Sequence, residues 1–518
     1  MKKNFTIIAL FFSLSYATIL TAKPTLAATT DQTLKNLLTE FEQYAENARL
    51  QWNVPGMAIA IVKNDRLIYS KGFGVKKLGE SSLVDPHTVF QIGSLTKAFT
   101  AALTAQLIDQ GKLGWQDRVI DHYPSFIMYD PYVTREFRVQ DLYAQHSGLQ
   151  TFAGDLQYVL GYDANHIVYH LRDIEPTTSF RSTYSYLNSL FVVGAKLNEK
   201  ITNISWENLL QENIFNPLEM KESSVGLKKY LQNKNIAGLH LLLNNKITAI
   251  PYDNLLTQGI YTGNGAAGGI NSNVIDMSKW LIMQLNEGSF KNKQLISKEN
   301  IKIMHAPQTL TSKFLDGWSS YALGWSYADG LSEPLISHNG ETAGAKAMIL
   351  LAPKSKVGIV ILTNDRDTLL PEALAYQFID KYLGNTKADW SKVYLDGYAK
   401  ITQHEKSQTQ ASLKVANYQK ALPLTVYTGI YNNKIYGDAK IVHQQNQLTF
   451  IIGPKHIAIP LQHLTGNIFI LKSPSELLGV FDTIDNPQII FNVTADGKVT
   501  DMDIPLFAAD SIGKFIKK

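Results

Sequence analysis

The stretch Phe90-Gln91-Ile92-Gly93-Ser94-Leu95-Thr96-Lys97-Ala98-Phe99-Thr100 places a serine and a lysine three residues apart at the start of an apolar helical pattern. On a helix, Ser94 and Lys97 lie one turn apart on the same face. This spacing sets an amine beside a hydroxyl, which an acyl-transfer serine requires because an unassisted hydroxyl is a weak nucleophile near neutral pH. The tetrad alone is not specific, since Ser511-Ile512-Gly513-Lys514 repeats it. The neighbouring sequence is therefore needed to tell which tetrad carries the chemistry.

The patterns on both sides of this stretch predict an α/β (α+β) domain. Residues 57–62 and 66–70 are strand-like runs joined by Asn64-Asp65, which predicts a hairpin. Residues 345–351 and 357–362 are two further apolar strands. Because strands occur at both ends of this region with helices between them, we expect one antiparallel sheet in which the two ends pair. Helices and a helical subdomain are expected to flank it. The clearest helices are at residues 206–214 and 274–285, and further helical stretches lie at 95–107 and 371–383.

Composition divides the chain into four segments. A charged start, an apolar core and the small-residue site Thr25-Leu26-Ala27 predict a cleaved signal peptide, with an uncleaved signal anchor as the alternative. A cleaved signal predicts an exported protein, periplasmic or secreted. The predicted segments are a signal peptide at 1–27, the α/β domain at 28–384, a polar linker with some helix at 385–423, and a small all-β domain at 424–518. Aromatic residues of the last segment are expected in its core, among them Tyr427, Tyr431, Tyr436 and Phe450.

Composition also narrows the function classes. The 518 residues contain no cysteine, so catalysis must use Ser, Lys, Tyr, His or carboxylates. The net charge of +4 comes without a long Lys/Arg run, which argues against a nucleic-acid partner. His404-Glu405 is followed by Gln408 where a zinc motif needs histidine, and no strand–turn–helix unit surrounds the G-x-G-x-x-G at residues 263–268. We therefore expect no metal and no cofactor, and we interpret residues 263–268 as a flexible or closely packed loop.

Two further motifs follow Ser94 in order along the chain. They are Tyr186-Leu187-Asn188 and His338-Asn339-Gly340, each weak singly but selected here by order and neighbouring sequence. A Ser-x-x-Lys followed by these motifs resembles the serine β-lactamase-related family, which includes class C β-lactamases, D-Ala-D-Ala carboxypeptidases, D-aminopeptidases and some esterases. Supporting segments extend the resemblance over roughly residues 34–384: 141–142 with 146–149, 216–220, 267–270 and 321–325.

The first two motifs supply the chemistry of acyl transfer. Lys97, if partly desolvated, is expected to lose its charge and take the Ser94 proton. Tyr186 is expected to relay that proton to the leaving group, provided that nearby cations lower its pKa from about 10. Asn188 is suited to hold both the substrate amide and the Lys97 amine. Together these residues predict a covalent acyl-enzyme on Ser94.

The third motif supplies the substrate side. The resemblance implies that the backbone N–H groups of Ser94 and of Glu341, which follows Gly340, form an oxyanion hole. His338 stands where class C enzymes have a lysine, and an imidazole carries a positive charge only below about pH 6.5. That weakens the case for an enzyme dedicated to antibiotics, which must hold a carboxylate, and fits the peptidase and esterase relatives.

We therefore predict an exported serine hydrolase of the β-lactamase/transpeptidase-like fold that acts through a Ser94 acyl-enzyme on small amides or esters. D-Amino-acid peptides or cell-wall fragments are the expected substrates. Two alternatives stay open: a β-lactamase that hydrolyses β-lactam antibiotics, and a penicillin-binding sensor or scaffold without turnover. The expected partner is a small-molecule or peptide substrate, with no nucleic acid and no stable membrane span after signal cleavage. The oligomeric state is left open.

Overall fold

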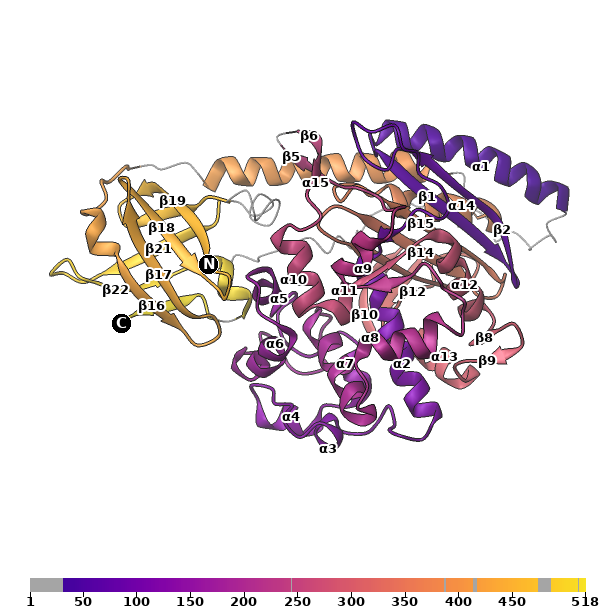
Figure 1. Ribbon diagram of the computed structural model, residues 1–518, viewed down its shortest axis with the longest axis horizontal. Coiled ribbons are helices and arrows are strands. Elements are labelled where there is room, and N and C mark those ends of the chain that lie inside the picture. The colour runs from indigo at the N-terminus through magenta and orange to yellow at the C-terminus, as the bar shows by residue number, and fades with distance from the viewer. Residues whose placement is uncertain (1–30, 244, 386–387, 413–416, 474–485, 511) are drawn as a thin grey trace.

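The structure is a computed structural model that describes residues 31–518 apart from 244, 386–387, 413–416, 474–485 and 511 (Figure 1). The predicted signal peptide over residues 1–27 and Ser511 of the second S-x-x-K tetrad lie outside the described residues. Within the described part of the chain, no helix has the length and apolar character needed to cross a membrane.

An eight-stranded antiparallel sheet organises the first domain. Its strand β1 (Gly56–Lys63) pairs with β15 (Val357–Thr363), with Met57 opposite Thr363 and Lys63 opposite Val357. This pairing confirms that the two ends of the domain meet in one sheet. Strand β1 also forms the predicted hairpin with β2. In spatial order the strands are β10 (Thr309–Phe314), β11 (Gly317–Tyr321), β12 (Ser326–Ala328), β13 (Leu335–Glu341), β14 (Lys346–Ala352), β15 (Val357–Thr363), β1 (Gly56–Lys63) and β2 (Arg66–Gly74).

Helices cover both faces of this sheet, which explains why its inner strands are apolar at nearly every position. Alternate residues of β1 point to opposite faces. Met57, Ile59 and Ile61 join a core shared with helices α1 and α14, whereas Ala58 and Ala60 join the larger core shared with α2 and α12. These helices are α1 (Asp31–Gln51), α2 (Thr96–Asp109), α12 (Val274–Leu285) and α14 (Leu370–Leu383).

A helical subdomain lies below the sheet in the view of Figure 1. The predicted helix at 206–214 is split there: α8 (Trp206–Leu210) continues into a wider π-helical turn (Gln211–Phe215). The glycine-rich residues 263–268 contain the end of α10 (Leu255–Gly263) and the whole of α11 (Gly265–Gly268), so the prediction of a loop there was wrong. The other helices are α3 (Val119–His122), α4 (Pro131–Glu136), α5 (Asp155–Val159), α6 (Ala164–His170), α7 (Ser189–Thr202), α9 (Leu227–Gln232) and α13 (Lys298–His305).

Three small sheets complete this domain. One joins β3 (Phe90–Gln91), β7 (Ile270–Ser272) and β4 (Ser224–Val225), and its strand β3 leads directly into the Ser94 segment. The other two are hairpins, β5 (Leu239–Leu243) with β6 (Lys246–Ile250) and β8 (Ser289–Phe290) with β9 (Lys293–Gln294).

The C-terminal part is a closed eight-stranded antiparallel barrel at one end of the molecule (Figure 1). Its aromatic residues Tyr427, Tyr431, Tyr436 and Phe450 are buried, which confirms that they belong to the core. The strands are β16 (Gly429–Asn433), β17 (Gly437–Gln444), β18 (Gln447–Ile452), β19 (Ile457–Thr465), β20 (Ile468–Leu471), β21 (Gln488–Val493), β22 (Val499–Asp503) and β23 (Lys514–Lys517).

The segment predicted as a linker carries the long helix α15 (Trp390–Ser412), which runs from the sheet domain toward the barrel (Figure 1). Its first turns pack on the sheet domain, where Trp390 is buried and donates from Nε1 to Asp380 Oδ2 at 2.7 Å.

The barrel also contacts the helical subdomain directly. The contacts between them, among the described residues, include hydrogen bonds from Tyr162 Oη to the Tyr436 carbonyl (2.5 Å), from His166 Nε2 to the Ile435 carbonyl (3.0 Å) and from Lys455 Nζ to Gln258 Oε1 (2.6 Å). Lys434 Nζ also pairs with Asp173 Oδ1 at 2.7 Å.

Candidate active site

Ser94 lies in a short 3₁₀ turn (Gly93–Leu95) that runs into α2. Its neighbours on both sides are buried, whereas Ser94 itself keeps partial exposure. Gly93 has φ +52, and a Cβ there would lie 2.6 Å from the backbone nitrogen of Glu341. The turn therefore needs glycine at 93, both for its left-handed backbone and for the close approach of β13.

Lys97 is fully buried, and its Nζ lies among three oxygen acceptors. It donates to Ser94 Oγ at 2.9 Å, to Asn188 Oδ1 at 2.6 Å and to the Ala267 carbonyl at 3.0 Å. Burial lowers the pKa of Lys97 to about 7, although the nearby Asp155 carboxylate acts to raise it. A substantial fraction of Lys97 is therefore neutral near pH 7, and a neutral amine at this distance can accept the Ser94 proton.

Tyr186 lies beside Ser94, and its ring is below the Lys97 Nζ at 4.8 Å from the ring centroid. Its phenol hydrogen-bonds to the Ser94 side chain. Burial raises the pKa of Tyr186 above its ordinary value, and this effect outweighs the Ser94 hydrogen bond. The condition that nearby cations lower this pKa is not met, because the effect of burial dominates and raises it. Tyr186 therefore stays protonated and is suited to donate a proton.

Asn188 immediately precedes α7 and joins Lys97 to a carboxylate that the motif analysis missed. Its Oδ1 accepts from Lys97, and its Nδ2 donates to Asp155 Oδ2 at 2.7 Å. Asp155 is the first residue of α5, which follows Gly154 at φ +91. Nothing in the local sequence marks Asp155, because it reaches the site only through the packing of α5. The expected contact of Asn188 with a substrate amide stays a prediction.

His338 lies on β13, facing Tyr186 and Tyr321. Its Nδ1 donates to the Asn339 carbonyl at 2.5 Å, so Nε2 accepts from the Tyr321 hydroxyl at 2.9 Å. Burial, together with the charge of Lys97, lowers the pKa of His338 to about 3. The expectation of a positive charge below about pH 6.5 is therefore wrong, since the ring is neutral throughout the ordinary pH range. The role predicted for His338 in substrate binding stays a prediction.

Gly340 lets β13 approach the nucleophile closely. A Cβ at this position would lie 2.0 Å from the Ile92 carbonyl oxygen and 3.1 Å from the Ser94 nitrogen. Strand β12 pairs with β13 only from Leu335 to Ser337, so residues 338–341 of β13 extend past the end of β12. The Glu341 peptide therefore lies close to the Ser94 turn, as an oxyanion hole requires. The Glu341 side chain is 53% exposed and pairs with the buried Lys346 at 3.1 Å.

Two further residues, one bonded to the Tyr186 segment and one bonded to His338, were not assigned a role from the sequence. Gln145, at φ +60, donates from Nε2 to the Leu187 carbonyl at 3.0 Å and accepts from the Leu187 nitrogen at 2.7 Å. Tyr321 bonds to His338, as described above. Both residues lie in or beside the segments that carry the family resemblance, which is the only sequence signal that points to them.

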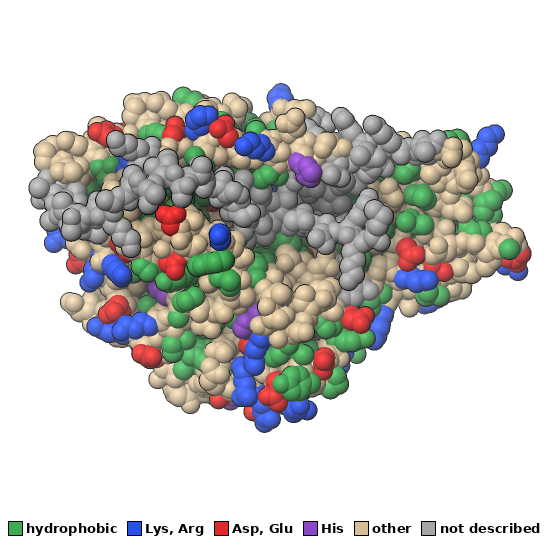
Figure 2. Space-filling view, turned by 180° about the vertical axis from the view of Figure 1, so that it is seen from behind, with side chains coloured by type: hydrophobic (Ala, Val, Ile, Leu, Met, Phe, Trp, Pro, Cys, Tyr) green, Lys and Arg blue, Asp and Glu red, His purple; other side chains and the backbone are tan. Residues whose placement is uncertain are grey.

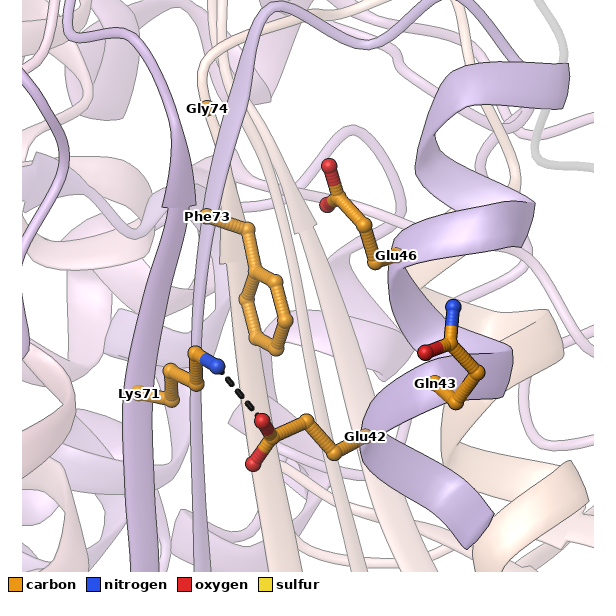
Figure 3. A pocket seen from close by; sticks show the side chains of 6 residues that line it. All are labelled: Glu42, Gln43, Glu46, Lys71, Phe73 and Gly74. Atoms are coloured by element: carbon orange, nitrogen blue, oxygen red, sulfur yellow. Dashed lines mark hydrogen bonds and ion pairs between the residues drawn. The ribbon is translucent and has the colours of Figure 1, made fainter. Parts of the chain in front are cut away.

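A groove between α1 and β2 is less suited to acyl transfer than the Ser94 site. Figure 3 shows this groove, where the Lys71 amine is paired with Glu42 at 2.5 Å and no hydroxyl nucleophile is present among the lining residues. Among the described residues, no group of three or more histidine and acidic side chains is placed to hold a metal ion. Basic and acidic side chains are interspersed over the face shown in Figure 2.

Known proteins resemble both parts of the chain. The Beta-lactamase family model matches residues 33–383, and a domain family of unknown function (DUF3471) matches residues 413–513. Unguisins hydrolase ungD' of Aspergillus campestris is 26% identical over 80% of this chain and 82% of its own length. Penicillin-binding protein 4 of Amycolatopsis lactamdurans is 26% identical over 61% of this chain and 82% of its own.

A solved structure agrees with the fold. The octameric penicillin-binding protein homologue from Pyrococcus abyssi superposes with a TM-score of 0.61 at 20% identity, covering 93% of this chain and all of that one. The family model spans well over half of the chain, and the Ser94–Lys97 pair occupies the geometry that acyl transfer demands. The chain is therefore a serine hydrolase of the beta-lactamase family.

Proposed function

We propose that this protein hydrolyses small amides or esters through a Ser94 acyl-enzyme, with D-amino-acid peptides or cell-wall fragments as substrates. One observation carries the proposal: Lys97 Nζ lies 2.9 Å from Ser94 Oγ, and burial has lowered the lysine pKa to about 7. A base with a pKa near the working pH combines a useful neutral fraction with adequate proton affinity.

The proposed reaction uses these groups one after another. Ser94 Oγ bonds to the substrate carbonyl carbon while its proton passes to Lys97 Nζ, and the resulting oxyanion faces the N–H groups of Ser94 and Glu341. The bond to the amine or alcohol then breaks. The leaving group takes a proton from the Tyr186 phenol, and the Lys97 ammonium restores it. Water next attacks the ester carbon, releasing the acid and returning the proton to Ser94.

One observation favours amide and ester substrates over β-lactam antibiotics. His338 is uncharged and hydrogen-bonded within the protein, so it offers no cation to an antibiotic carboxylate. The similarity to a protein named as a hydrolase of unguisins supports hydrolysis, whereas the similarity to a penicillin-binding protein is compatible with the β-lactam alternatives as well. Export by residues 1–27 is part of the same proposal, because cell-wall substrates lie outside the cytoplasm; fractionation of cells that express the full chain tests it.

Two experiments test the proposal. A fluorescent fluorophosphonate is expected to label the wild-type protein on the Ser94 peptide, and Ser94→Ala is expected to abolish the label. A substrate panel then compares D-Ala-D-Ala peptides, D-amino-acid amides, short esters and a cephalosporin. Fastest turnover of the cephalosporin would establish a β-lactamase instead. Labelling of Ser94 without release of product from any substrate would establish a sensor or scaffold.

A further inference from the structure

A buried carboxylate lies behind the catalytic lysine. Asp155 is only 9% exposed, and its Oδ2 accepts from Asn188 Nδ2 at 2.7 Å. The Oδ1 of the same Asn188 side chain accepts from Lys97 Nζ at 2.6 Å. Two short hydrogen bonds therefore connect Asp155 to Lys97 through one carboxamide.

The two ends of that carboxamide are not interchangeable. An ionised carboxylate only accepts hydrogen bonds, so Asp155 requires the Nδ2 end of Asn188. This leaves Oδ1 facing Lys97, where it accepts from the lysine in both its charged and its neutral form. In the reversed orientation the amide N–H₂ would face Nζ and repel the protonated lysine. Asp155 thus selects the orientation that allows Lys97 to hold and release a proton.

We propose that Asp155 is a positioning residue of the acylation step, which orients Asn188 and sets the pH above which Lys97 takes the Ser94 proton. This inference rests on the proposed function and assigns Asp155 a part in it. Burial lowers the pKa of Lys97, and the Asp155 charge raises it. The result of about 7 is therefore a balance, and without Asp155 the lysine would be neutral at lower pH but a weaker base.

The other titratable groups around Lys97 and Asp155 do not take this role. Burial raises the pKa of each surrounding tyrosine, so these phenols are neutral, and the His338 ring is neutral as well. The Glu341 carboxylate is paired with Lys346. These tyrosines are Tyr158 on α5, Tyr184 and Tyr186 before α7, and Tyr321 on β11; His338 and Glu341 lie on β13.

Helix α5 is closely packed on two sides. A Cβ on Gly259 of α10 would lie 2.1 Å from the Tyr158 carbonyl oxygen, which shows how closely α10 packs against α5. On the barrel side, a Cβ on Gly453 would lie 2.7 Å from the carbonyl oxygen of Leu160, just after the helix. Asp155 is therefore carried by a short helix packed between α10 and the turn after β18.

The test measures the pH dependence of fluorophosphonate labelling at Ser94, which needs no natural substrate. Asp155→Asn keeps the shape of the side chain and removes its charge. Its acid limb is expected to move to lower pH by about one unit, the scale of one charge acting across a single side chain in a partly screened interior. The plateau rate is expected to fall about tenfold or more because the base is weaker and less well oriented. Asp155→Glu is expected to move the limb back toward the wild-type position.

Asp163→Asn is the matched control, because it removes a carboxylate at the exposed start of α6, and asparagine keeps the cap there. Its limb is expected to coincide with that of the wild type. An unshifted limb with an unchanged plateau in Asp155→Asn overturns the inference. If thermal unfolding shows that Asp155→Asn does not fold, Asp155→Ser replaces it, with the same expected shift and the same refuting result. An unlabelled wild-type Ser94 would instead refute the proposed function itself.

Discussion

Gly340→Ala tests whether the close approach of β13 builds the acylation site. The new Cβ would lie 2.0 Å from the Ile92 carbonyl oxygen. Carbon and oxygen atoms in contact are normally separated by about 3.3 Å or more, so β13 must move away from the Ser94 turn by about 1 Å. A displacement of that size costs on the order of 10²-fold in rate, and the loss of one oxyanion donor costs about 10²–10³-fold in kcat. We therefore expect kcat/KM to fall by about 10²–10³-fold, mainly through kcat.

The assay combines hydrolysis of a chromogenic ester with the rate of fluorophosphonate labelling, and a thermal melt checks that the variant is folded. Gly79→Ala is the control, because an added Cβ there has no atom within 4 Å; Gly79, unlike Gly340, adopts a positive φ, +86. It is expected to lose a little stability and to keep full activity. A folded Gly340→Ala with kcat/KM within about threefold of wild type would refute the reasoning.

Four further predictions concern proton transfer and the barrel. Lys97 acts in its neutral form, so kcat/KM is expected to rise with pH through about 7; a profile that is flat from pH 5 to 9 would contradict this. The native pKa of Lys97 lies below the unfolded value of about 10.4, so between these two pH values the unfolded chain binds more protons than the folded one. The wild type is therefore expected to lose thermal stability relative to Lys97→Met as pH falls from about 10 to about 7, with no further relative loss at lower pH. Tyr186→Phe is expected to lower kcat by about 10²–10³-fold while Ser94 still labels slowly, since the phenol donates to the leaving group; a change confined to KM would contradict that role. Gly453→Ala is expected to lower kcat/KM severalfold by pressing the barrel turn on Leu160, whereas Gly497→Ala, also at positive φ but in open space, is expected to leave it unchanged; equal effects of the two substitutions would show that only barrel strain matters.

Much of the architecture was predictable because its signals are local. The hairpin of β1 and β2 follows from two apolar runs around Asn64-Asp65, and helices α12 and α14 follow from apolar spacing with clear end signals. The pairing of β1 with β15 was inferred from the order of elements and is confirmed. The π-helical turn after α8 and the helices at 263–268 were not predicted, because tertiary packing determines them rather than residue propensity.

The nucleophile pair belongs to the part that sequence alone determined. Ser94 and Lys97 lie one helical turn apart whatever surrounds them, because that spacing is a property of the backbone. Only the tertiary structure decided the protonation states of the site, since desolvation depends on every group packed around a side chain. Burial makes Lys97 a usable base, keeps Tyr186 protonated and leaves His338 uncharged. The contact of Asp155 with Asn188 is likewise tertiary, because it joins helices that lie far apart along the chain.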